Sequence, residues 1–378
     1  MPPFKDELDI AAARRLAREL AAAWPGFPTR RFTNGLNRAL EPLELLARRD
    51  AIAERLVYAM PNRFADAADI LYHALESTTF TGWIVEPCNA YVARAGIDDP
   101  DTALPLLAAL TPRWSSEFAI RPFIERHPAR TYAYLYEWLA NGDEHVRRLV
   151  SEGTRPRLPW APQLRGLIAD PTLNLPLLHA LAGDPAPYVR RSVANHLNDV
   201  SKDHPDLALE IAERWAPQGD GHMWTVRHGL RTLVKRGNSR ALRIVGAAVD
   251  ATVELVRLSI DRDHVRVGDA VTIELILSTP ADSAAVNAIV DYRVHYIGAD
   301  GNPKAPKVFK LTRRRLVPGK PVKITRAHRF EDVSIRRIHP GCHRIDVQVN
   351  GRVLGGVDVN VADAGRIDGG PSTKSRSS

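Results

Sequence analysis

Residues 147–160, RRLVSEGTRPRLPW, form the stretch around which the rest of the chain is organised. Arginines crowd a predicted helix and the loop after it, a glutamate stands directly before a glycine, and a tryptophan lies between two prolines. A second stretch at residues 188–205, YVRRSVANHLNDVSKDHP, has a similar composition and is predicted to form a basic amphipathic helix with an acid near its end. A cation-rich surface that retains a few carboxylates suits a protein that grips a polyanion and stabilises a positive charge within it.

The two retained acids, Glu152 and Asp199, occupy positions that local rules disfavour. Gly153 is expected just past the end of a helix, and Asp199 comes late in the apolar-periodic run of the second stretch. A carboxylate at a helix C-terminus is destabilising by about 0.3 kcal/mol or more. Either acid alone is best explained as a solvated side chain paired with neighbouring arginines. Together, on equivalent ends of repeated helices, they indicate a functional site.

Length and charge limit the class of protein. A chain of 378 residues is long enough for two or three domains. Residues 1–112 carry 12 basic and 15 acidic side chains, residues 113–247 carry 19 and 14, and residues 248–378 carry 21 and 15. This distribution favours a nucleic-acid partner over a small acidic metabolite. A helix with a basic face opposite a large apolar one, typical of membrane-surface binding, is not evident.

The cysteines and the missing motifs exclude several chemistries. Cys88 and Cys342 are too far apart in the chain for a disulfide framework or a Cys-rich zinc site. The N-terminus is too acidic for a signal peptide, and no apolar run is long enough to span a membrane. We therefore expect a cytoplasmic protein, associated with the nucleoid when bound to DNA. Motifs for phosphate loops, dinucleotides and metal-binding helices are absent, so any catalysis is expected to need no metal and no cofactor.

Helical periodicity dominates the chain before residue 250. From residue 113 an approximate repeat appears, in which Ile120, Val146, Val189 and Val226, each followed by arginine, are expected to open basic helices. Second helices are expected at 131–140, 175–182 and 207–215. The repeat spacing is close to that of two-helix repeats, which stack into curved arrays. Residues 1–247 are therefore predicted to form an all-α HEAT-like solenoid with the arginines and acids on its concave face.

The pattern changes near residue 250. Seven short alternating segments separated by turn residues predict an all-β immunoglobulin-like sandwich over residues 251–363. Residues 364–378 have little apolar content and are expected to be disordered. A basic cluster around one predicted strand, residues 304–315, suggests an edge that grips DNA, although edge lysines also guard against aggregation.

Three further site predictions come with alternatives. Glu117 is expected in the first turn of a helix, where capping alone would explain it. Trp160 is either a hydrophobic plug between helix pairs or a surface that stacks on a nucleotide. Seven cations are predicted to form a phosphate-binding stripe: Arg147, Arg148, Arg155, Arg157, Arg190, Arg191 and Lys202.

With SSEFAIRPFI at residues 115–124, these stretches resemble the AlkC branch of the AlkC/AlkD-type DNA alkylation repair glycosylases. The three motifs occur in the family's order, and the resemblance covers the helical region to about residue 247. It implies a HEAT-like solenoid that excises 3-methyladenine and 3-methylcytosine from DNA without base flipping. It also implies that Glu117, Glu152 and Asp199 are the active-site acids and that Trp160 is their aromatic neighbour.

The residues themselves are consistent with such chemistry. An N3-alkylated base is cationic and leaves readily, and carboxylates beside the deoxyribose can stabilise the oxocarbenium-like sugar and orient the attacking water. The expected partner is therefore double-stranded DNA with alkylated bases, bound by a monomer with no obligate protein partner. The competing hypothesis is a non-enzymatic HEAT-repeat scaffold that binds DNA or a protein through the same groove. A scaffold, however, would have no use for acids that weaken phosphate binding.

Overall fold

The computed structural model describes residues 4–333 and 336–363, and these form two compact units that divide between Leu230 and Arg231. Helices continue to Ile244, close to the expected end of the helical region at residue 247. The last two helices, α16 (Arg231–Lys235) and α17 (Ser239–Ile244), nevertheless belong to the second unit. The tail predicted to be disordered, 364–378, lies outside the described residues. Among the described residues, no helix is long and apolar enough to cross a membrane.

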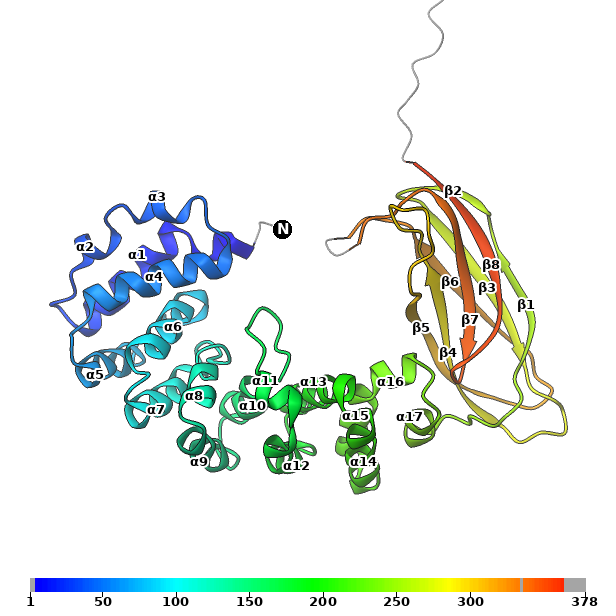
Figure 1. Ribbon diagram of the computed structural model, residues 1–378, viewed down its shortest axis with the longest axis horizontal. Coiled ribbons are helices and arrows are strands. Elements are labelled where there is room, and N and C mark those ends of the chain that lie inside the picture. The colour runs from blue at the N-terminus through cyan, green and yellow to red at the C-terminus, as the bar shows by residue number, and fades with distance from the viewer. Residues whose placement is uncertain (1–3, 334–335, 364–378) are drawn as a thin grey trace, which may run out of the picture. The chain divides into compact units, whose positions relative to one another are not determined.

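The helices of the first unit follow one another along a curved array (Figure 1). The helical periodicity expected before residue 250 corresponds to helices throughout this unit, and prolines or glycines lie at several of their boundaries. The elements are η1 (Phe4–Leu8), α1 (Ile10–Ala23), α2 (Thr29–Thr33), α3 (Leu36–Leu40), α4 (Leu45–Ala59), α5 (Phe64–Ala74), η2 (Gly82–Val85), α6 (Glu86–Ala95), α7 (Pro100–Leu110), α8 (Arg121–Arg126), α9 (Pro128–Trp138), α10 (Glu144–Gly153), α11 (Arg165–Ala169), η3 (Thr172–Asn174), α12 (Leu175–Leu181), α13 (Pro187–Asp203), α14 (Pro205–Trp215), η4 (Ala216–Gln218) and α15 (Asp220–Gly229).

Helices from residue 121 onward pack in two rows, which confirms the predicted HEAT-like solenoid. Helix α13 packs between α10 and α15 in one row, while α9, α12 and α14 of the other row pack across them. The apolar stripe of α13, including Val189, Val193 and Leu197, is fully buried. Burying each such side chain stabilises the fold by about 1.5–3 kcal/mol. This packing fixes α10 and α13 side by side, so the acids on these helices can share one site.

Three local predictions were wrong. Gly153 is the last residue of α10 rather than the residue after it, and its role is close packing, since an added Cβ would lie 2.5 Å from Cγ2 of Ile120. Glu117 lies in the turn before α8 and not in the helix itself. Val226 lies well inside α15, because Gly219, with a φ of 118°, lets that helix begin at Asp220.

The second unit contains the predicted immunoglobulin-like sandwich. Its sheets have the strand orders β1-β3-β6 and β2-β8-β7-β4-β5, and side chains from both sheets form one hydrophobic core. Strand β2 was not predicted, because three residues are too few for alternation to be recognised. The strands are β1 (Glu254–Ile260), β2 (His264–Arg266), β3 (Ala270–Ser278), β4 (Val286–His295), β5 (Lys307–Leu316), β6 (Val322–Arg329), β7 (Gly341–Val349) and β8 (Arg352–Ala362).

The basic cluster predicted from the sequence falls largely on β5, which is an edge strand of the five-stranded sheet. Lys307, Lys310, Arg314 and Arg315 on this strand are exposed. The position agrees with both interpretations of the cluster, a DNA-binding edge and a charged guard against strand pairing.

Candidate active site

The first unit brings the predicted site residues together. Glu117, Glu152 and Trp160 line one pocket of about 560 Å³, together with Arg148 and Arg155. The third acid, Asp199, is on α13 and reaches the same place through an ion pair with Arg155. Acids from the turn before α8, from α10 and from α13 therefore converge on one part of the solenoid.

Carboxylates and cations alternate in one continuous chain of ion pairs, made by Glu117, Arg148, Glu152, Arg155, Asp199 and Lys202. At its start, Nη1 of Arg148 lies 2.7 Å from Oε2 of Glu117, and its Nη2 lies 3.6 Å from Oε1 of Glu152. The Arg148 guanidinium lies over the ring of Tyr188, 4.8 Å from its centroid. It also donates a 3.0 Å hydrogen bond to Oγ of Ser115. Arg148 thus holds the turn carrying Glu117 against α10.

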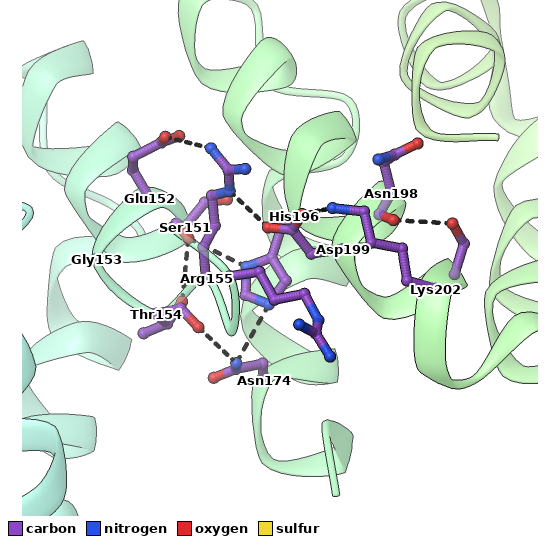
Figure 2. A network of polar contacts seen from close by, with 12 residues as sticks. Ser151, Glu152, Gly153, Thr154, Arg155, Asn174, His196, Asn198, Asp199 and Lys202 are labelled. Carbon is purple, nitrogen blue, oxygen red and sulfur yellow. Dashed lines mark hydrogen bonds and ion pairs between the residues drawn. The ribbon is translucent and has the colours of Figure 1, made fainter. Parts of the chain in front are cut away.

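Arg155 is the central link of this ion-pair chain (Figure 2). Its Nη1 donates to Oε1 of Glu152 at 2.7 Å, and its Nε donates to Oδ2 of Asp199 at 2.9 Å. Lys202 donates to the other oxygen of Asp199 at 2.9 Å. Burial disfavours the charged guanidinium of Arg155, yet the two carboxylates more than offset this and raise its pKa. Glu152 is only 5% exposed and Asp199 only 2%, so their geometry is set by these bonds.

A buried polar network supports the two helices that carry these acids (Figure 2). Asn174 donates to the carbonyl of Thr154 at 3.1 Å and to Nε2 of His196 at 3.3 Å. His196 Nδ1 can then donate to the carbonyl of Ser151 at 3.1 Å. Burial lowers the pKa of His196 to about 4, so the ring is neutral near pH 7. The network ties α13 to the C-terminal end of α10 and fixes the relative positions of their carboxylates.

Trp160 projects from a constrained loop rather than filling the core. Its side chain is 64% exposed and its φ is 67°, which is uncommon for a residue with a Cβ. The buried guanidinium of Arg121 holds this loop by donating to the carbonyls of Gly153, Arg155 and Pro162 at 3.0, 2.7 and 2.6 Å. The exposure excludes the hydrophobic-plug alternative and leaves the ring available to a ligand.

The seven predicted phosphate contacts divide into distinct groups. Arg148 and Arg155 belong to the ion-pair chain. Arg147 is bonded to the carboxylate of Asp184, and Arg190 donates to backbone carbonyls. Lys202 also belongs to the ion-pair chain, Arg157 is partly buried and bonded to Asp203, and Arg191 is exposed.

Some of these pairings could have been found in the sequence. Arg148 and Glu152 are four residues apart on α10, and Asp199 and Lys202 are three apart on α13, which are the spacings of neighbours on a helix surface. The roles of Arg121 and Asn174 had no such signal, because their partners are distant in the chain. Among the described residues, no three His, Cys, Asp or Glu side chains are grouped as a metal site.

A repeat solenoid with buried acids paired to arginines, followed by an immunoglobulin-like sandwich, defines a narrow class of two-domain protein. Residues 254–363 match the model of the family described as "Uncharacterised protein YhaZ, C-terminal Ig-like domain". The YhaZ protein of Bacillus subtilis (strain 168) is 31% identical over 362 residues, which cover 96% of this chain and 100% of that protein.

A solved structure is similar to this chain over most of its length. It is the alkylpurine DNA glycosylase AlkC of Pseudomonas fluorescens, bound to DNA containing an abasic site analog. The TM-score is 0.91 at 34% identity, covering 96% of this chain and 100% of that one. The chain belongs to the AlkC-type family of DNA alkylation repair glycosylases, in the group with a C-terminal immunoglobulin-like domain.

Proposed function

We propose that this protein is a DNA glycosylase of base excision repair, acting on cationic N3-alkylated bases such as 3-methyladenine and 3-methylcytosine in double-stranded DNA. The observation that carries the proposal is the pair of buried carboxylates, Glu152 and Asp199, held by Arg155 beside a pocket that Arg113 and Arg148 also line. The family relationship to an alkylpurine DNA glycosylase supports the same reaction class.

The chemistry uses positioned negative charge rather than protonation of the base. An N3-alkylated base already carries the positive charge that makes it a leaving group, and this charge moves to the deoxyribose as the glycosidic bond lengthens. Glu152 and Asp199 stabilise the sugar cation electrostatically, and one of them orients the attacking water. Glu117, third in importance, lines the same pocket and is held in place by Arg148. Because carboxylates act on the sugar, the base need not be flipped into a pocket of its own.

The surrounding residues supply DNA binding. Trp160 packs its exposed ring against the lesion nucleotide or its sugar, and the solvent-accessible cations Arg157, Arg191 and Lys202 contact phosphates. The basic edge strand of the second unit adds further contacts to the duplex. Bound in this way, the protein acts as a monomer in the cytoplasm, on the nucleoid.

The decisive experiment measures release of free base. Purified full-length protein is incubated with methylated duplex DNA and a chelator, and the released bases are separated by chromatography. We expect 3-methyladenine and 3-methylcytosine to appear while unmodified bases stay in the DNA. Binding of the duplex without base release would favour the non-enzymatic scaffold, and loss of release in chelator would overturn the metal-independent mechanism.

A further inference from the structure

A second pocket lies next to the candidate active site. It has a volume of about 280 Å³ and is formed by residues of α4, α6, α8 and the loop that carries Trp160. Phe118 and Trp160 line both this pocket and the one that contains Glu117 and Glu152. The two pockets therefore adjoin at a shared aromatic wall.

Glu86 gives this second pocket an unsatisfied acceptor. The residue lines the pocket and is 2% exposed. Its Oε1 receives a long contact of 3.4 Å from Nη1 of Arg49, and its Oε2 is buried with no hydrogen-bond partner among the described residues. Burial raises the pKa of Glu86 to about 8, which Arg49 and a hydrogen bond from the Trp114 side chain offset only in part. Buried carboxyl oxygens without hydrogen-bond partners are rare, so Oε2 of Glu86 indicates that a ligand donates a hydrogen bond here.

The cations of this pocket are already engaged. Arg49 and Arg94 both contact the carboxylate of Asp50, at 2.9 and 3.2 Å, and Arg121 donates to three backbone carbonyls. Much of the remaining lining is apolar, from alanines, prolines and the two shared aromatic rings. A phosphate would find few free donors here. A flat, neutral molecule with an N–H donor would meet both the apolar walls and Glu86.

We propose that this second pocket binds a neutral nucleobase, the product of excision, with an N–H of the base donated to Oε2 of Glu86 and its ring against Phe118 and Trp160. The inference rests on the proposed function. Hydrolysis adds water to the sugar carbon and releases the alkylated base uncharged, with the water proton leaving to solvent. Once neutral, the base is no longer attracted by the carboxylates of the first pocket, and the adjoining pocket offers it apolar surface and a hydrogen bond.

The test measures binding of free 3-methyladenine and adenine to the full-length protein without DNA, by calorimetric titration. We expect saturable binding at about pH 9, where a carboxyl group with a pKa of about 8 is ionised, and Glu86→Gln should weaken it by about tenfold, since it replaces a charge-assisted hydrogen bond. Ala90→Leu, which fills the pocket from α6, should abolish it. Glu125→Gln, the same change at an exposed acid of the same pocket, should leave the affinity within about twofold. Thermal unfolding of each variant establishes that it is folded.

The outcomes separate this inference from the proposed function, because no catalysis is needed for the titration. Absence of saturable binding to the wild-type protein would overturn the nucleobase pocket, whether or not base excision occurs. Equal affinities in wild type, E86Q and A90L would place the bound base elsewhere. If E86Q instead weakens binding of abasic duplex DNA and leaves free-base affinity unchanged, the pocket serves a base of the DNA strand and not the released product.

Discussion

Arg155 and Arg157 are two residues apart and both were predicted to bind phosphate, but the structure gives them different roles. The side chain of Arg155 is 8% exposed and joins two buried carboxylates. That of Arg157 is 29% exposed and pairs with Asp203 on the surface. Removing Arg155 leaves Glu152 and Asp199 without their shared partner, whereas removing Arg157 leaves a solvated acid.

We therefore expect Arg155→Ala to destabilise the first unit by about 3–5 kcal/mol, as when one partner of a buried ion pair is removed. Arg157→Ala should cost no more than about 1 kcal/mol. Urea unfolding of the two variants in parallel measures the difference. Combining R155A with Glu152→Gln and Asp199→Asn should recover much of the lost stability, because the uncompensated charges are then gone.

DNA binding by the same two variants should show the reverse order of effects, with the larger change in R157A. R157A should flatten the salt dependence of affinity by about one unit, as expected when one phosphate contact is lost. A folded R155A protein should keep the wild-type slope. If R155A instead loses no more stability than R157A and flattens the slope to the same extent, Arg155 is a phosphate contact and the reasoning above is wrong.

Three further outcomes are expected. Glu152→Gln and Asp199→Asn should each slow base excision by about 100- to 1000-fold in single-turnover assays, while the affinity for DNA stays unchanged or rises. Asp203→Asn is the matched control. A parallel loss of DNA affinity in Glu152→Gln and Asp199→Asn would indicate that the two acids are purely structural. Because burial lowers the pKa of His196 to about 4, the unfolded state binds more protons between about pH 6.5 and 4, so stability should fall as pH is lowered through this window. The stability of the His196→Gln variant should lack this component of the pH dependence. If its stability varies with pH as that of the wild type does, the prediction is wrong. Truncation after Leu230 should leave a cooperatively folding helical unit that binds DNA more weakly and excises bases more slowly. If the truncated protein excises bases as fast as the full-length protein at limiting enzyme, the second unit is dispensable.

The sequence was sufficient for the architecture because the relevant signals are local. Apolar residues at helical spacing, closed by proline or glycine, marked the helices before residue 113, and strict alternation marked strands such as β3. Boundaries were less accurate where tertiary contacts decide them, as at Gly153, whose missing Cβ accommodates Ile120.

The acids of the candidate site could be predicted from the sequence, but the hydrogen-bond network that fixes their positions could not. Glu152 and Asp199 could be singled out because carboxylates are unusual near helix C-termini. The network of Asn174 and His196, and the orphan oxygen of Glu86, depend on residues brought together from distant parts of the chain. No spacing rule in one sequence identifies such contacts, and only the packed solenoid shows them.

The alternating ion-pair chain has a consequence for how this enzyme can be tuned. Its three carboxylates and three cations sum to no net charge, so the site as a whole neither attracts nor repels the sugar-phosphate backbone at long range. Under the proposed function, residence time on DNA then depends on cations outside the ion-pair chain, such as the exposed Arg191. Search along the genome and turnover at a lesion can therefore be optimised separately, since a surface substitution can change one without disturbing the other.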